Sequence, residues 1–356
     1  MTEPNIFVDP NIASTERAFP MQGRYAYLRY DMNENPEGLP KEFVDSVLAE
    51  ITPEFLSIYP EPDAFLNKYA DYMGVSRENV VATNGTDTAI RYLLQTFCGK
   101  GHEVVTVSPS FEMYWVNCDI LGLKHVPVTY NDDLTINVDR IIDAITPATD
   151  IVVLLNPNNP VGNVYTDEEA TAIIDAAERN HALVIVDEAY QYFYDHSFLD
   201  IARGRKNVAI LRTFSKLFSI ASLRLGVIIS SPEVIHYVEN AKLTFDANAL
   251  ALKFGERIMD NKWLIKDLMA KQQGGKDYTL STLAGAGYEV RDCRGNFIFV
   301  RTKRNAAQVA RELQDEKKVL VKYWSSGMLA PYLRVSTGSV EAMRKFVEPF
   351  LEVDSR

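Results

Sequence analysis

The chain has 356 residues, of which 47% are hydrophobic and 24% are charged, as in ordinary globular enzymes. This length can bury a large core and is typical of about two domains. The net charge of −11 argues against nucleic acid or an anionic membrane as the main partner, because both repel an acidic protein. No apolar run approaches the ~18 residues of a membrane span, and the N-terminus has neither the basic region nor the apolar region of a secretory signal. We therefore expect a cytoplasmic protein whose partner is a small molecule.

Six short apolar runs alternate with helical patterns between about residues 78 and 240. They lie at 80–82, 103–107, 151–155, 183–186, 208–211 and 225–229. Because these runs lack polar alternation and helices separate them, they predict a mostly parallel sheet covered on both faces. The last third has helices and short strands at 288–291, 296–300 and 332–336, which predicts a smaller α+β domain. The predicted fold class is α/β, and ligands of such sheets bind beyond the carboxyl ends of the strands.

Lys216 follows the apolar run 208–211 and stands among Phe214, Leu217 and Phe218. A lysine amine is a nucleophile only when it is neutral, and its reference pKa is about 10.4. Burial or a neighbouring positive charge lowers that pKa. The environment of Lys216 therefore suits a lysine that holds an aldehyde cofactor as a Schiff base. A solvated surface lysine is the alternative interpretation, so the prediction depends on the other residues at the strand ends.

Those residues match the needs of pyridoxal 5′-phosphate, which requires an anion for its ring nitrogen and donors for its phenolic oxygen. Asp187 directly follows the strand 183–186, and a buried carboxylate needs a cation such as a pyridinium N–H. An N-cap or a surface ion pair is the alternative for Asp187. Tyr190 and Asn159 are predicted donors to the phenolic oxygen. Turn chemistry explains the prolines and the glycine around Asn159, but not its extra asparagines.

The cofactor also needs a cup for its phosphate and a ring that stacks on it. A helix start after a strand and a cluster around Lys216 supply N–H groups, hydroxyls and a guanidinium: Gly85, Thr86 and Asp87, with Thr213, Ser215 and Arg224. Simple N-capping by Thr86 and Asp87 is compatible with phosphate binding. Phe111 is predicted to stack on the ring, with a place in the core as the alternative. Arg334, inside an apolar strand, needs an anion, which a substrate carboxylate would provide.

Through these segments and others, the sequence resembles the fold-type-I pyridoxal-phosphate aminotransferases of class I/II, and among them the histidinol-phosphate aminotransferase branch. They cover nearly the whole chain and are more specific for fold and cofactor than for substrate. The matching segments lie at 33–36, 59–61, 84–87, 158–162, 187–190, 213–216, 223–226 and 332–334.

The resemblance implies that Lys216 carries the cofactor and shuttles a proton, and it gives the other residues the roles proposed above. It adds Tyr59, which would reach the phosphate of the neighbouring subunit and so implies an obligate homodimer. Asn33, Lys322 and Arg334 are the expected substrate-binding residues. Lys322 stands where the branch carries an arginine, and it keeps the charge without the bidentate fork.

The expected activity is therefore that of an aminotransferase for an amino acid or a related, possibly phosphorylated, amine. A decarboxylase, or an elimination or cyclisation enzyme, on the same scaffold is the alternative, and an intact Lys216 argues against a non-catalytic module. We expect an N-terminal segment, 1–40, that packs with the small domain. A large cofactor-binding domain, 41–245, and a small domain, 246–356, would follow it. Cys98, Cys118 and Cys293 lack the spacing of a zinc site, so idle thiols in a reducing cytosol and no metal are expected.

Overall fold

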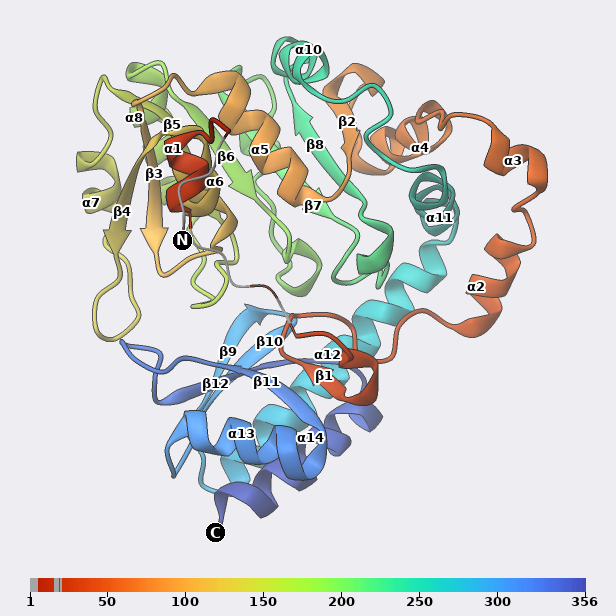
Figure 1. Ribbon diagram of the computed structural model, residues 1–356, viewed down its shortest axis with the longest axis vertical. Coiled ribbons are helices and arrows are strands. Elements are labelled where there is room, and N and C mark those ends of the chain that lie inside the picture. Colours follow the sequence, from red (N-terminus) through yellow and green to blue (C-terminus); the bar gives the residue numbers. More distant parts are fainter. Residues whose placement is uncertain (1–5, 16–18, 20) are drawn as a thin grey trace.

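The computed structural model describes residues 6–15, 19 and 21–356, so the predicted N-terminal segment is described only in part. Two sheets organise these residues, one above the other in Figure 1. The larger has seven strands in the order β2-β8-β7-β6-β5-β3-β4, and the smaller has five in the order β1-β11-β12-β10-β9. No helix among the described residues has the length and apolarity needed to span a membrane.

The larger sheet is parallel except at β8, which runs antiparallel to both of its neighbours, β2 and β7. This arrangement confirms the predicted mostly parallel sheet. β4 was not predicted, because exposed and buried positions mix along it and it contains Pro127. As an edge strand it pairs only with β3, and an edge tolerates a proline. The strands are β2 Val80–Thr83, β3 Glu103–Ser108, β4 Lys124–Thr129, β5 Thr149–Leu155, β6 Leu183–Asp187, β7 Val208–Thr213 and β8 Gly226–Ser230.

Helices cover both faces of the larger sheet, so successive residues of a central strand are buried on opposite sides. In β5, Val152 and Leu154 join one core cluster, whereas Ile151 and Val153 join the other. The first cluster lies under α4 Asp63–Met73, α7 Val138–Asp143, α8 Asp167–Arg179 and α11 Ala249–Asp260. The second lies under α5 Thr86–Phe97, α6 Met113–Leu121 and α10 Pro232–Ala241. Short helices complete this part: α1 Pro10–Ser14, α2 Lys41–Leu48, α3 Pro53–Ser57 and α9 Leu199–Ala202.

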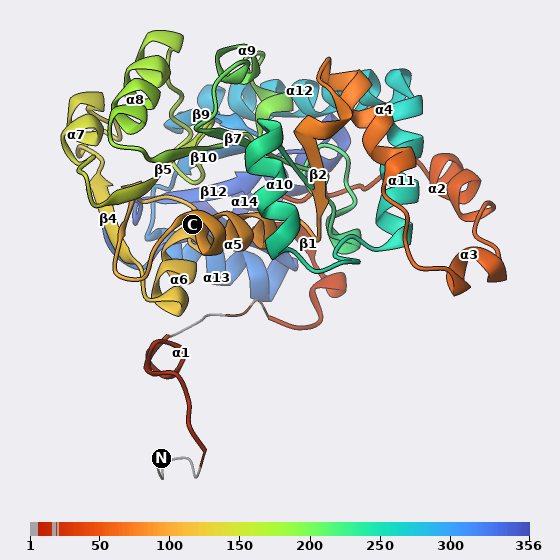
Figure 2. The same ribbon diagram turned by 90° about the horizontal axis from the view of Figure 1, so that it is seen from above.

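The smaller sheet packs against long helices and takes in part of the N-terminal segment. Its β1 pairs parallel with β11, while α1 lies against α6 of the other part (Figure 2). α11 packs on α4, and α12 leads from there to the small sheet (Figure 1). The exact domain limits stay a prediction. The elements are β1 Leu28–Tyr30, β9 Val290–Gly295, β10 Phe297–Arg301, β11 Val319–Tyr323, β12 Tyr332–Ser336, α12 Lys262–Gly285, α13 Ala306–Lys317 and α14 Val340–Asp354.

Candidate active site

Lys216 lies just beyond the end of β7, on the side of the larger sheet that faces the smaller one. Its side chain is half-buried, and its Nζ donates a hydrogen bond to the carbonyl oxygen of Met32 at 3.1 Å. Burial, and next the positive charge of Arg334, lower the pKa of Lys216 to about 8, against the opposing effect of Glu34 and Asp87. The amine is therefore partly neutral near neutral pH, as a nucleophilic lysine requires.

Asp187 ends β6 and is buried, so it is neither an N-cap nor a surface ion pair. Its Oδ2 accepts from the Tyr114 hydroxyl at 2.8 Å, and its Oδ1 accepts from the main-chain N–H of Ala189 at 3.1 Å. Burial raises the pKa of Asp187 to about 6, and these two hydrogen bonds oppose the rise. Among the described residues, no lysine or arginine forms an ion pair with this carboxylate. Tyr114 was missed from the sequence, although it lies one helical turn from Phe111.

Glu188, the next residue, forms an ion pair with an arginine, whereas Asp187 does not. Its Oε2 lies 2.6 Å from Nη2 of Arg212, and both side chains are almost fully buried. Arg212 also donates from Nη1 to Gln191 Oε1 at 2.6 Å. This pair was not predicted from the sequence. The signal was available, because Arg212 ends an apolar run and a buried guanidinium needs an anion.

Tyr190 and Asn33 meet at the boundary between the two sheets. Both are buried, and Asn33 Nδ2 donates to the Tyr190 hydroxyl at 2.9 Å. Burial raises the pKa of Tyr190 to about 12, so the phenol keeps its proton at physiological pH. The Tyr190 ring packs edge-on against Phe297, with 5.2 Å between the ring centroids.

Arg334 joins the small sheet to the loop after β5. Its Nη1 donates to Asn159 Oδ1 at 2.5 Å, and its Nη2 donates to the carbonyl oxygen of Asp31 at 2.5 Å. Its Nε is buried and has no hydrogen-bond partner among the described residues, and burial lowers the pKa of the guanidinium. Lys322 lies directly opposite Arg334 in the β11–β12 register and is exposed. The two expected substrate-binding cations are therefore neighbours, one buried and one at the rim.

The residues predicted to form the phosphate cup include the start of α5 and Arg224, which lie together. Gly85 is the N-cap, so neither Thr86 nor Asp87 has that role. Arg224 adopts a left-handed backbone with φ of 58°, and its Nη2 lies 3.1 Å from Asp87 Oδ2. A Cβ at Gly85, where φ is 78°, would lie only 2.4 Å from Arg224 Nη2. Glycine is therefore required here for the guanidinium to lie over the helix start.

Strand pairing brings the start of α5 close to the other predicted phosphate ligands, which lie at and after the end of β7. Thr213, at the end of β7, pairs with Gly226, and a Cβ at Gly226 would lie 2.8 Å from the main-chain nitrogen of Thr86. Thr213 Oγ1 accepts from the N–H of Ser215 at 3.1 Å. Both hydroxyl residues are buried, whereas Arg224 is more exposed. The fold thus places the predicted hydroxyls and the helix start at one end of the sheet.

Phe111 is half-buried at the margin of the second core cluster, with its ring 6.5 Å from that of Tyr114 and nearly perpendicular to it. A cavity of about 160 Å³ opens beside it, lined also by Trp115 and His125. Because Tyr114 binds Asp187, Phe111 lies next to the partner of the buried carboxylate. This position suits a ring that stacks on a ligand held by Asp187.

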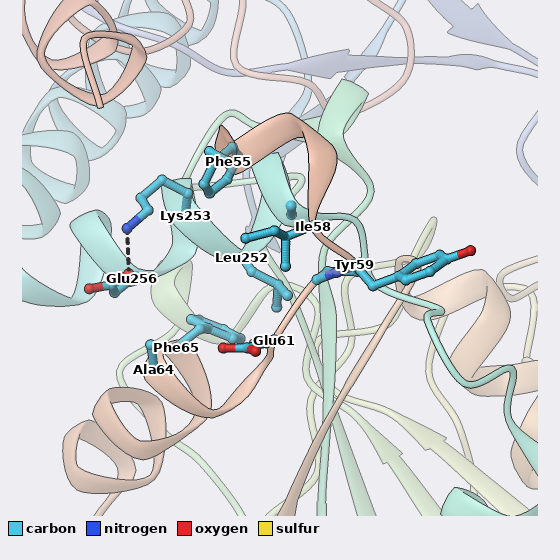
Figure 3. Close-up of a pocket in the computed structure, with 11 residues that line it drawn as sticks. Phe55, Ile58, Tyr59, Glu61, Ala64, Phe65, Leu252, Lys253 and Glu256 are labelled. Atoms are coloured by element: carbon cyan, nitrogen blue, oxygen red, sulfur yellow. Dashed lines mark hydrogen bonds and ion pairs between the residues drawn. The ribbon is translucent and has the colours of Figure 1, made fainter. Parts of the chain in front are cut away.

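Tyr59 lies apart from these residues. It is 72% exposed, and its ring stacks on Phe245 with 4.3 Å between the centroids. Figure 3 shows the Tyr59 ring pointing away from Lys253 and Glu256, at one end of a cavity of about 230 Å³. No contact among the described residues joins Tyr59 to Lys216. Within a single chain, this predicted site residue is therefore not brought into the site.

The residues present fit pyridoxal 5′-phosphate on two observations. Asp187 is a buried carboxylate without a cation, as a site for a protonated ring nitrogen requires. Because Arg224 lies close to Gly85, its guanidinium and the main-chain N–H groups at the start of α5 lie together, as an anion site requires. Among the described residues, no group of three or more His, Cys, Asp or Glu side chains could hold a metal ion.

Comparison with known proteins shows what the chain is related to. The family model "Aminotransferase class I and II" matches residues 30–350. The histidinol-phosphate aminotransferase of Clostridium novyi (strain NT) is 30% identical over 329 residues, which cover 91% of each chain. The histidinol-phosphate aminotransferase 1 of Mesorhizobium japonicum is 31% identical over 319 residues, covering 86% of this chain and 85% of the relative.

Solved structures agree with this relationship at the level of the fold. The histidinol-phosphate aminotransferase from Sinorhizobium meliloti, in complex with pyridoxal-5′-phosphate, has a TM-score of 0.88 at 20% identity and covers 99% of both chains. The enzyme from Clostridium acetobutylicum has a TM-score of 0.83 at 22% identity, covering 92% of this chain and 99% of that one. The matches confirm the predicted fold and enzyme class. The chain belongs to the class I and II aminotransferase family.

Proposed function

We propose that this aminotransferase uses pyridoxal 5′-phosphate to move an amino group between a 2-oxo acid and an anionic amine related to histidinol phosphate. The observation that carries the proposal is Lys216, whose pKa is lowered to about 8 at the end of the sheet where Asp187 is buried without a cation. The names of the relatives support the amine, because both curated relatives reported above are histidinol-phosphate aminotransferases.

Pyridoxal 5′-phosphate is the cofactor, and when bound it supplies an aldehyde that condenses with amines and a ring that withdraws electrons. Asp187 holds the ring nitrogen, and Phe111 stacks on the ring. Tyr190 and Asn159 bind the phenolic oxygen. Main-chain and side-chain donors at the start of α5 and after β7 hold the phosphate: Gly85, Thr86, Asp87, Thr213, Ser215 and Arg224. The Asp87 carboxylate acts by holding Arg224, since the two form an ion pair.

Lys216 moves the proton. Because its pKa is about 8, Nζ can be neutral and accept a proton near physiological pH, and then return it. The Met32 carbonyl accepts a hydrogen bond from Nζ and so fixes the direction of the amine. Arg334, the largest charged contribution to the lowered pKa, keeps Lys216 from holding a proton permanently. Burial of this region excludes the water that would otherwise compete for the same proton.

Arg334 and Lys322 recognise the anionic groups of the substrates. The Arg334 fork suits a carboxylate, and its unpartnered buried Nε leaves donor capacity for one. Lys322 is exposed opposite it and suits a second, solvated anion such as a phosphate. Asn33, the third residue expected at the substrate, donates instead to the Tyr190 hydroxyl at 2.9 Å. Two cations side by side favour a doubly anionic substrate over a simple apolar amino acid.

A panel of half-reactions tests the function. The purified protein, loaded with pyridoxal 5′-phosphate, is mixed with histidinol phosphate, glutamate, aspartate and phenylalanine in turn, and products are read by absorbance and mass spectrometry. We expect pyridoxamine 5′-phosphate and the corresponding oxo product, fastest with histidinol phosphate. Release of carbon dioxide instead would favour the decarboxylase alternative, which neither reported curated relative supports.

We further propose that the enzyme is a homodimer with shared sites. Tyr59 is exposed and has no contact with the other site residues of its own chain, so a role at the phosphate requires a second copy. Leu56 and Ile58, just before Tyr59 in the chain, are exposed, as are Leu243 and Phe245, and Phe245 stacks on Tyr59; an interface covers apolar surface of this kind. The three cysteines are free, as suits the reducing cytoplasm in which we place the enzyme.

A further inference from the structure

Asn33 is buried where the N-terminal segment, the small sheet and the large sheet meet, and each of its polar atoms has a protein partner. Its main-chain N–H donates to Ser336 Oγ at 2.8 Å, and its carbonyl oxygen accepts from Asn296 Nδ2 at 2.9 Å. Its Nδ2 donates to the Tyr190 hydroxyl at 2.9 Å, and its Oδ1 accepts from Ser336 Oγ at 3.4 Å. The side chain is thus directed at Tyr190.

Ser336 fixes which end of the Asn33 amide faces Tyr190. The oxygen of Ser336 already accepts the Asn33 main-chain N–H, so its single hydroxyl proton goes to Asn33 Oδ1. The amide then presents its N–H₂ end to Tyr190, in agreement with the 2.9 Å hydrogen bond from Nδ2 to the hydroxyl. A phenol that accepts this hydrogen bond keeps its own proton for another acceptor. Among the described residues, no group accepts that proton from Tyr190.

Charged groups of the proposed site lie around Tyr190. Arg334 and Asp187 both act on its pKa, and Lys216 Nζ lies 5.9 Å from the centre of its ring. Resting on the proposed function, we propose that Asn33 is a positioning residue that makes Tyr190 a hydrogen-bond donor to the phenolic oxygen of the cofactor. Asn33 would then act on the cofactor through Tyr190 and not by binding substrate.

The hydrogen bond from Tyr190 should affect the pKa of the light-absorbing group that Lys216 forms with the cofactor, and this pKa can be measured. When this group loses its proton, negative charge is left on the phenolic oxygen, and a donor to that oxygen stabilises the charge. A donating Tyr190 therefore holds this pKa low. The other charges that face Lys216 come from Arg334, Glu34, Asp87 and Arg224, and they remain constant in the comparison below.

Asn33→Asp reverses the hydrogen bond while keeping the shape of the side chain. Asn33 has φ of 55°, a left-handed backbone that aspartate tolerates. The carboxylate would accept the Tyr190 proton and take it from the cofactor. We expect the pKa of the lysine–cofactor group, from absorbance against pH, to rise by about one unit or more. The dissociation constant of the cofactor should rise several-fold as well.

Two controls separate this effect from the added negative charge. In a Tyr190→Phe background, Asn33→Asp should shift the pKa by less than half as much, because the effect runs through the hydroxyl. Asn35→Asp makes the same change two residues away, where Asn35 contacts Ser219 and Gly38 and not Tyr190, and should shift it less. Equal shifts in either comparison would overturn the inference.

Ser336→Ala provides a second variant if Asn33→Asp does not fold. It removes the hydroxyl that orients the amide, so we expect a smaller rise in the same pKa, and an unchanged pKa would count against Asn33. Failure of the proposed function looks different, because the unsubstituted protein would then form no lysine-linked absorbance band with pyridoxal 5′-phosphate.

Discussion

Arg334 Nη1 donates a 2.5 Å hydrogen bond to Asn159 Oδ1, which joins β12 of the small sheet to the loop after β5 of the large sheet. Both residues belong to the proposed site, one for the substrate and one for the cofactor. A carboxylate that takes the Arg334 fork competes with Asn159 for the same donors. Substrate binding is therefore expected to change the hydrogen bonding of a residue that holds the cofactor.

Lys216→Ala tests the covalent anchor. The variant should form no lysine-linked cofactor, because Lys322, the other lysine proposed for the site, is exposed and is assigned to the substrate. Borohydride reduction followed by mass spectrometry of the denatured protein measures the link directly. Lys322→Ala is the control and should keep the covalent link between Lys216 and the cofactor. A reduced cofactor found on a lysine of the Lys216→Ala protein would refute the assignment.

The lowered pKa of Lys216 predicts how cofactor capture depends on pH. The neutral amine reacts, and its fraction increases as the pH rises through about 8. The rate of capture by cofactor-free protein, followed by stopped-flow absorbance, should rise up to this pH and then level off. Arg334→Gln removes a positive neighbour and should move the midpoint upward. A midpoint near 10.5 in the unsubstituted protein would contradict the structure.

Asp187→Asn should stabilise the protein without cofactor and inactivate it with cofactor. The pKa of Asp187 is raised to about 6, so the folded state binds more protons than the unfolded state between about pH 4 and 6. Stability is therefore lost as the pH rises through this window. At pH 7 we expect the variant to be more stable by about 1–3 kcal/mol in urea unfolding, with the difference vanishing near pH 4.

In the loaded enzyme the same amide cannot carry the negative charge that the ring nitrogen needs. We expect turnover to fall by about 100-fold or more, with only a modest loss of bound cofactor. Steady-state kinetics and the absorbance of bound cofactor measure the two quantities. Near-normal turnover in Asp187→Asn would show that the carboxylate has no part in the reaction.

Arg334→Lys and Lys322→Ala should have different effects on substrates. Arg334→Lys loses a bidentate fork and should raise KM for every carboxylate substrate by about 10-fold or more. Lys322→Ala should raise KM mainly for phosphorylated amines, and Lys322→Arg should restore it. Steady-state kinetics with histidinol phosphate and glutamate compare the two. An equal effect of Lys322→Ala on both donors would remove its proposed role at the phosphate.

Gly85→Ala should weaken cofactor binding specifically. A Cβ at Gly85 would lie 2.4 Å from Arg224 Nη2, so the guanidinium would have to leave the helix start. Gly101→Ala is a matched control, since Gly101 has φ of 81° and nothing within 4 Å of the added atom. Both variants carry a backbone penalty of about 1 kcal/mol, but only Gly85→Ala should raise the dissociation constant of the cofactor, by about 10-fold.

The sequence predicted the residues that lie at strand ends and missed those that act through partners far away along the chain. Lys216 and Asp187 follow uninterrupted apolar runs, and such runs form central strands whose ends gather at one edge. Tyr114 became visible only when the fold placed it beside Asp187, whereas Arg212, which pairs with Glu188, had a signal in the apolar run that it ends. β4 and β1 were missed because an edge strand needs little apolar pattern and a three-residue strand shows none.

The neighbouring carboxylates of Asp187 and Glu188 link the stability of the folded protein to the binding of its cofactor. Arg212 neutralises Glu188, whereas Asp187 has no such cation and destabilises the folded chain at neutral pH. A ligand that provides the missing positive charge binds the folded state alone and so shifts folding in its favour. Chains without the cofactor would therefore unfold more often than chains that hold it.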